Sequence, residues 1–146
     1  MKKMFVLFAA VVIAVSTWAS PSPAENAKAT AAFEKEFAGA TDPQWTSVED
    51  LYVVTFKLNN ETMRAWYSEN GEFKAVQRYV KPRQMTLLAA KKLEELSTQA
   101  KIVSVEEVSK EGVFYYLVKT ENEKAKITYS LSSTGEALKL EKKKKR

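Results

Sequence analysis

The sequence of 146 residues contains no cysteine and no histidine. Without them the chain has no disulfide, no thiol nucleophile, no imidazole base and no Cys/His zinc site. Glycine and proline are also scarce, with four of each, whereas apolar residues make up 45% and charged residues 28% of the chain. This composition is typical of a folded globular chain of one or two small domains, and it argues against an enzyme.

The first 24 residues have the pattern of a cleaved secretory signal peptide. Lys2 and Lys3 precede an apolar run over residues 4–15, and small residues and prolines follow as far as Ala24. The run is shorter than the ~20 apolar residues that a membrane-spanning helix needs. We expect cleavage after Ala24, with cleavage after Ala19 as the alternative, and a mature protein that is periplasmic or secreted. An uncleaved membrane anchor is the other interpretation.

The net charge of +5 comes from the two ends of the chain. Residues 1–24 hold two lysines and no acidic residue, and the last five residues are all basic, so residues 25–141 carry 16 basic and 18 acidic groups. A nucleic-acid interface needs clustered basic residues on the folded body, and we therefore expect no nucleic-acid partner. The basic tail comprises Lys142, Lys143, Lys144, Lys145 and Arg146.

A block of like charges predicts a disordered tail over residues 142–146. The simpler interpretation of this tail is a solubilising end. The alternative is a weak contact with an anionic envelope surface, since lipid headgroups and lipopolysaccharide carry negative charge.

Turn residues divide the rest of the mature chain into two stretches, residues 25–81 and 82–141. The first stretch is predicted to form a helix over 27–38, followed by strands at 44–48, 51–58, 62–68 and 72–80. The second is predicted to form a helix that starts after Thr86, followed by strands from 102 onward and at 113–120, 125–131 and 136–140. Apolar side chains recur at helical spacing in the helices and alternate in the strands.

The two stretches align at an offset of 62 residues, which places Tyr52 with Phe114 and Tyr67 with Tyr129. We therefore expect an α+β fold, namely a tandem repeat of one helix plus a four-stranded antiparallel meander. The helices would pack on one face of the sheet.

One helix covers only one face of a four-stranded meander, so the opposite face is expected to be open. The side chains predicted on that face include Val53, Arg64, Trp66, Tyr115 and Leu117. Aromatic residues and arginine dominate the energetics of protein interfaces. Trp66 and Tyr115 are therefore the candidate anchors for a protein or peptide partner. The alternative is that the other repeat or a second copy of the chain covers this face.

Acidic residues occur in adjacent pairs at positions 49–50, 94–95 and 106–107. Neighbours along a strand point to opposite faces, so these pairs are better explained as surface charge than as acid–base catalysts. Glu121 and Glu123 supply too few oxygen ligands for calcium. We expect no catalytic residue, no metal and no cofactor.

Short motifs spread over residues 27–141 suggest a family. They are Phe37-Ala38-Gly39-Ala40, Trp45, the Tyr52-to-Phe56 strand, Trp66-Tyr67 leading to Gly71, Val80-Lys81-Pro82 before a helix, and Ile102 to Glu106. This set resembles the PepSY-like family of exported bacterial proteins, which is also described as beta-lactamase-inhibitor-like. The resemblance implies an architecture similar to that of the beta-lactamase inhibitory protein, whose concave sheet grips a partner protein. It implies no catalytic residue.

Together these features predict an exported, non-enzymatic binding protein that docks an unknown protein or peptide of the periplasm on the open sheet face. One alternative is an envelope-associated scaffold or stress protein that uses the basic tail. The other is a small-ligand carrier, which requires a cavity of ~300 Å³ or more.

Overall fold

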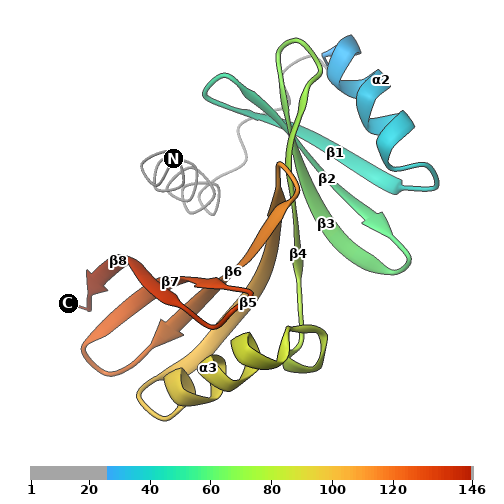
Figure 1. The fold of residues 1–146 in the computed structure, drawn as a ribbon. Coiled ribbons are helices and arrows are strands. Elements are labelled where there is room, and N and C mark those ends of the chain that lie inside the picture. The colour runs from blue at the N-terminus through green and yellow to red at the C-terminus, as the bar shows by residue number, and fades with distance from the viewer. Residues whose placement is uncertain (1–25, 146) are drawn as a thin grey trace. The chain divides into compact units, whose positions relative to one another are not determined.

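The computed structural model describes residues 26–145. In this part of the chain two α-helices, one short 3-10 helix and eight strands follow one another (Figure 1). In chain order the elements are α2 (Ala27–Glu36), β1 (Thr41–Val48), β2 (Leu51–Leu58), β3 (Glu61–Ser68), β4 (Phe73–Tyr79), η1 (Pro82–Gln84), α3 (Leu87–Ser97), β5 (Lys101–Lys110), β6 (Val113–Glu121), β7 (Ala125–Ser132) and β8 (Ala137–Lys144).

The predicted fold class is wrong. The eight strands belong to one antiparallel sheet in the order β1 to β8, not to two repeats with a helix and a meander each. The helices contribute only 10 and 11 residues, so the described chain is mostly β rather than α+β. The physical reason is the cost of free strand edges. Two separate sheets would leave the edges of β4 and β5 free, and a free edge exposes unpaired backbone groups. The chain satisfies them past the end of β4, where the Val80 N–H donates to the Val105 carbonyl at 3.0 Å.

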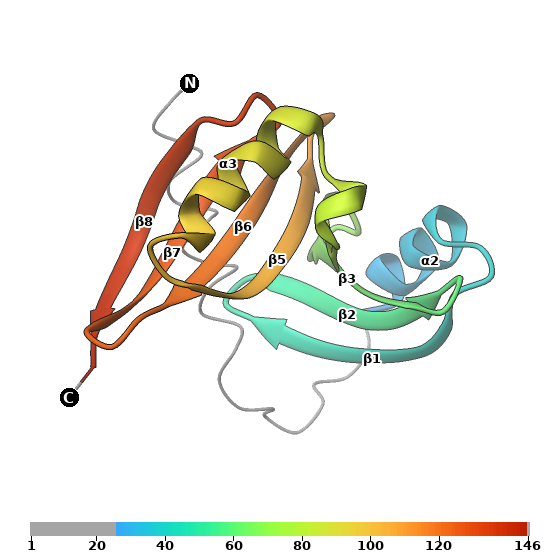
Figure 2. The same cartoon turned by 90° about the horizontal axis from the view of Figure 1, so that it is seen from below.

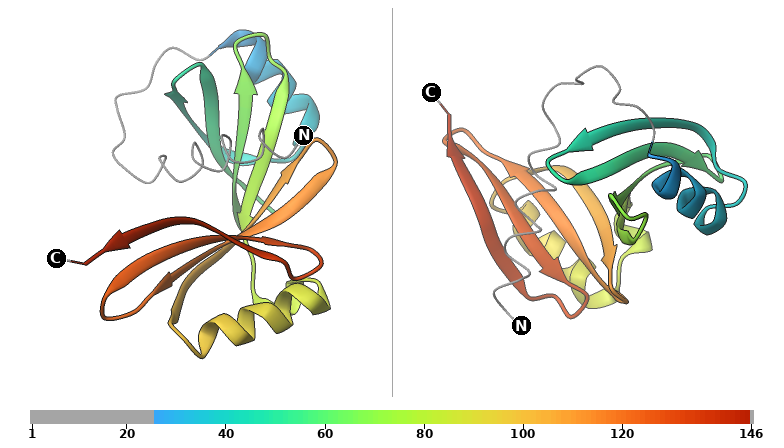
Figure 3. Two further views of the ribbon diagram at one scale, coloured as in Figure 1. Left: turned by 60° about the vertical axis from the view of Figure 1, so that its left-hand side comes forward. Right: turned by 90° about the horizontal axis from the view of Figure 1, so that it is seen from above.

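Two compact units can be described, each by itself. The first comprises residues 26–78 together with Ser109–Gly112, and the second comprises Tyr79–Val108 together with residues 113–145. In the first unit, α2 packs on one face of its strands (Figure 3). The rings of Phe33 and Phe56 lie 4.9 Å apart at the centre of this core. Asn26 caps α2 by accepting from the N–H groups of Lys28 and Ala29, both at 3.0 Å.

In the second unit, α3 lies across the strands that follow it (Figure 2). Its buried side chains, Ala89, Leu93 and Leu96, recur at helical spacing and pack on the sheet. The strands contribute Val105, Tyr116, Val118 and Leu131 to this core, and the segment between β4 and α3 contributes Val80 and Met85. The face of the sheet that α3 covers therefore forms one hydrophobic cluster of this unit.

The basic end of the chain is ordered as far as the structure describes it. β8 extends to Lys144, and the Lys145 N–H donates to the Lys124 carbonyl at 3.0 Å. The expected disorder of residues 142–144 is therefore wrong. Pairing with β7, which places Lys142 opposite Ile127, satisfies the backbone despite the repulsion between the lysines. Arg146 and the predicted signal peptide lie outside the described residues. Among the helices of residues 26–145, none has the length and apolarity to cross a membrane.

Candidate functional site

The structure places most of the predicted partner-binding residues in the interior. Val53, Trp66 and Leu117 are almost completely buried, Tyr115 is only 7% exposed, and Arg64 is half-buried. Val53 and Trp66 lie directly opposite each other on β2 and β3. The expected exposure is therefore wrong for four of the five residues, because alternation along a strand shows which side chains share a face but not whether that face is covered. Their contact with a partner stays a prediction.

The local chemistry of the two predicted anchors is that of core residues. Burial raises the pKa of the Tyr115 hydroxyl to about 12. The indole N–H of Trp66 is buried and has no hydrogen-bond partner. An unpaired buried donor costs about 1–3 kcal/mol. Trp66 thus contributes packing area at the expense of one unsatisfied polar group.

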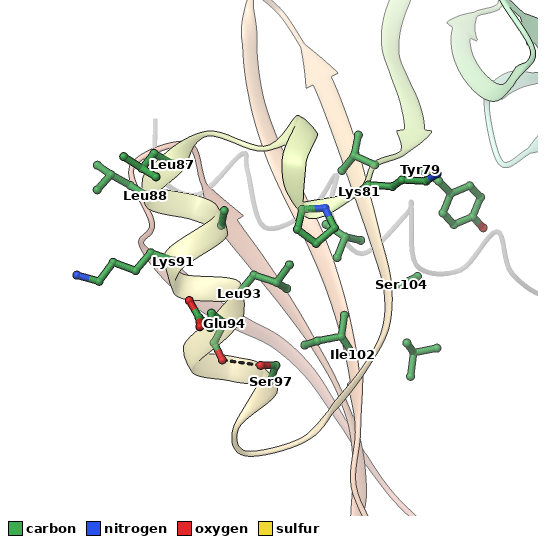
Figure 4. Close-up of a pocket in the computed structure, with 15 residues that line it drawn as sticks. Tyr79, Lys81, Leu87, Leu88, Lys91, Leu93, Glu94, Ser97, Ile102 and Ser104 are labelled. Atoms are coloured by element: carbon green, nitrogen blue, oxygen red, sulfur yellow. Dashed lines mark hydrogen bonds between the residues drawn. The ribbon is translucent and has the colours of Figure 1, made fainter.

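A different surface has the shape of a binding site. A groove of about 1200 Å³ lies within the second unit, between α3 and β5, and we call it the α3–β5 groove (Figure 4). One wall comes from α3 and the other from the first half of β5, and residues 79–82 supply further lining. The lining residues are Tyr79, Val80, Lys81, Pro82, Leu87, Leu88, Ala90, Lys91, Leu93, Glu94, Ser97, Ile102, Val103, Ser104 and Val105.

The groove gathers apolar side chains that are exposed to solvent. Leu87 is 84% exposed, Tyr79 63%, and Leu88 and Val103 are each 54% exposed. Among the described residues eight large hydrophobic side chains are exposed, and four of them line this groove. Single exposed hydrophobic residues are normal, but a contiguous group of them marks an interaction site.

The start of α3 is fixed by hydrogen bonds to the sheet. The Thr86 N–H donates to the Tyr116 hydroxyl at 3.1 Å, and the Thr86 hydroxyl donates to the Ser133 carbonyl at 2.6 Å. The same hydroxyl accepts from the Ala89 N–H as the helix cap. Two elements far apart in sequence therefore hold the helix wall of the groove in place.

The rim of the groove and its interior differ in character. The outward side of α3 mixes Leu87 with Lys91 and Glu94, whereas Leu93 and Ile102 lie deeper in the groove (Figure 4). The Ser97 hydroxyl donates to the Glu94 carbonyl at 2.6 Å, so its proton is already engaged by the helix backbone. The groove therefore has an apolar interior with a charged rim, which suits an apolar ligand with polar flanks.

The groove residues were not predicted as a site. Leu87 and Leu88 precede the buried stripe of α3 and do not belong to it. Two adjacent leucines outside the buried stripe are a signal that sequence inspection could have used. Tyr79 and Val103 gave no such signal, because only the fold brings them to the same groove. Within residues 26–145, no group of three metal-ligating side chains is present.

Three solved structures from Bacteroides species share this fold. A protein of B. eggerthii that is inferred to be periplasmic has a TM-score of 0.73 and 15% identity, and the match covers 86% of this chain and 90% of that one. A DUF2874 family protein of B. uniformis has a TM-score of 0.72 and 17% identity, with 87% and 90% covered. A BLIP-like protein of B. fragilis has a TM-score of 0.69 and 16% identity, with 88% and 89% covered.

These similarities establish the fold and nothing finer. No family model matches the chain, and no curated protein matches it either. The expected architecture of the beta-lactamase inhibitory protein type is supported by the BLIP-like structure. The PepSY-like family name stays a prediction.

Proposed function

We propose that this chain is an exported, non-enzymatic binding protein that holds an extended apolar segment of a partner protein in the α3–β5 groove. The observation that carries the proposal is the concentration of exposed hydrophobic side chains along this groove. Similarity to a BLIP-like fold and to a protein inferred to be periplasmic supports a binding role outside the cytoplasm.

A polypeptide segment fits the groove better than a small molecule does. Small-ligand sites measure about 300–1,000 Å³ and bury 70–90% of their ligand. The groove is larger, at about 1200 Å³, and its rim residues Leu87 and Val103 are mostly exposed. A segment of a larger protein can bury its apolar side chains in the groove on one side, while its other side stays exposed to solvent or packed on its own domain.

The test uses a peptide library displayed on phage and selected on the chain without its predicted signal peptide. We expect selected peptides to carry bulky aliphatic or aromatic side chains. Their affinity, measured by fluorescence polarisation, should fall at least tenfold in the Leu87→Ser/Val103→Ser variant. The matched control is Val113→Ser, because Val113 is 50% exposed but lies outside the groove. Equal losses in both variants, or no loss in either, would contradict the proposal.

The small-ligand alternative is tested in the same assay. A fatty acid that displaces the peptide and binds the wild-type chain tightly by itself would favour a carrier. Export is tested separately by the intact mass of the protein from a periplasmic fraction, which should begin at Glu25.

A further inference from the structure

The second unit gathers lysine side chains at one end of its sheet. Glu121 at the end of β6 lies directly opposite Lys126 at the start of β7. The Lys145 ammonium lies 2.5 Å from the Glu121 carboxylate. The hydrogen bond from Lys145 lowers the pKa of Glu121, and the charges of Lys126, Lys145 and Lys101 lower it further. Three lysines from separate strand ends therefore approach one carboxylate.

We call the whole group the cationic end. Its lysines are Lys101, Lys124, Lys126, Lys142, Lys143, Lys144 and Lys145. The acidic residues among them are Glu121, Glu123 and Glu141, so the group contains seven positive and three negative charges.

The arrangement includes an unfavourable pair. Lys126 lies directly opposite Lys143 across β7 and β8. Like charges in directly opposed positions destabilise a sheet. Lys143 offsets part of this through an ion pair with Glu141 at 3.2 Å. The fold therefore keeps a local excess of positive charge that its stability does not require.

Protection of a sheet edge explains only some of these lysines. β8 is the last strand in the sheet order, and lysines on an edge strand discourage pairing with another chain. Lys126 lies on β7, Lys101 starts β5, and Lys124 belongs to the β6–β7 turn. These three do not lie on the edge strand, so a second reason for the charge is needed.

We propose that the cationic end binds the phosphate groups of an anionic phospholipid surface. Residues that are directly opposed in an antiparallel pair point to the same face, so Lys143 shares a face with Lys126, while Lys142 and Lys144 point to the other. Lysines that point to both faces of one strand do not enclose a single ion. Because they lie at the ends of the strands and are long, they can contact several headgroups of a membrane surface at that end of the sheet. Lysine is a strongly hydrated point charge, which suits contact without fixed geometry. This inference does not depend on the groove.

The test is sedimentation of the chain without its predicted signal peptide with lipid vesicles. We expect binding to phosphatidylcholine vesicles that contain 30% phosphatidylglycerol, and none to vesicles of phosphatidylcholine alone. Each lysine near an anionic surface contributes about a fivefold gain in binding, so Lys126→Gln/Lys143→Gln should weaken it on the order of 20-fold. The control is Lys35→Gln/Lys57→Gln, which removes the same charge from the first unit.

Three results would overturn the proposal. Equal weakening in both double variants would mean that net charge alone attracts the protein. Displacement by inorganic phosphate beyond that by chloride at equal ionic strength would indicate a single-ion site. Tighter binding to a DNA duplex than to the anionic vesicles would assign the surface to nucleic acid. Because the vesicle assay contains no peptide, its failure leaves the groove proposal unaffected.

Discussion

Replacing Gly135 tests how tightly the β7–β8 turn approaches the start of α3. A Cβ atom at Gly135 would lie 2.8 Å from the carbonyl oxygen of Leu88. Real Cβ atoms do not come this close, and the obstacle is backbone that cannot rotate away. The first turn of α3 must therefore move if Gly135→Ala is to fold.

The magnitude follows from a matched comparison with Gly39. The two glycines have nearly the same backbone angle, φ +87 at Gly135 and +88 at Gly39, but a Cβ at Gly39 would meet nothing within 4 Å. Left-handed backbone costs a non-glycine residue about 1–2 kcal/mol, and the less flexible unfolded chain offsets about 0.4–1 kcal/mol of it. Gly39→Ala should therefore lose about 1 kcal/mol. Gly135→Ala should lose about 2–4 kcal/mol, because overpacking adds about 1–3 kcal/mol.

The assay is urea unfolding followed by circular dichroism, with the free energy of unfolding extrapolated to water. Since Leu88 also lines the groove, Gly135→Ala should in addition weaken binding of the selected peptides, and Gly39→Ala should not. Equal losses of stability in the two variants would refute the reasoning, because they would show that the turn and the helix do not touch.

Three further predictions concern polar groups of the second unit. Thr86→Ala removes the hydroxyl that donates to the Ser133 carbonyl and should cost about 1–2 kcal/mol of unfolding free energy, whereas Thr86→Ser should retain most of it. Lys119→Met removes the ammonium that donates to the Glu106 carboxylate at 3.0 Å and should cost about 3 kcal/mol of unfolding free energy, because Glu106 is only 3% exposed. Adding Glu106→Leu should recover much of this loss, and strictly additive losses would argue against the pair. The tyrosines of the unfolded chain ionise near pH 10, whereas the folded pKa of Tyr115 is about 12, so stability is lost as the pH rises from 10 toward 12. Measured by urea unfolding, the free energy of unfolding of the wild type should therefore fall by about 2 kcal/mol more between pH 9 and pH 12 than that of Tyr115→Phe.

Local patterns along the chain predicted the elements well and their assembly poorly. The strand over residues 51–58 was predicted from alternation alone and is β2 in the structure. The last strand was predicted to end at 140, because a run of lysines is typical of a disordered tail, but β8 continues to Lys144. Backbone pairing with β7 outweighs the mutual repulsion of the lysine side chains, which favours a disordered tail. The same holds for the single sheet, since the pairing that follows β4 leaves no periodic signal.

The candidate site shows the same limit more sharply. Aromatic content pointed to Trp66 and Tyr115, and both are large enough to anchor a partner, but size and alternation do not reveal what covers a face. Leu87 and Leu88 lie outside the buried stripe of α3, but helical spacing does not show what the two leucines face. The significance of Leu87 depends on Val103, which the chain reaches only after α3 has ended.

This difference in burial decides which variants can test binding. Replacing a buried aromatic residue such as Trp66 by alanine costs about 3–5 kcal/mol, and a domain has only about 5–15 kcal/mol of stability in total. A variant that removes both Trp66 and Tyr115 is thus expected to unfold in part, and a partner that it loses reports on folding. Leu87 and Val103 are exposed, and surface substitutions usually change stability by less than about 0.5 kcal/mol. A partner lost by their replacement, with the unfolding free energy unchanged, can therefore be assigned to the groove itself.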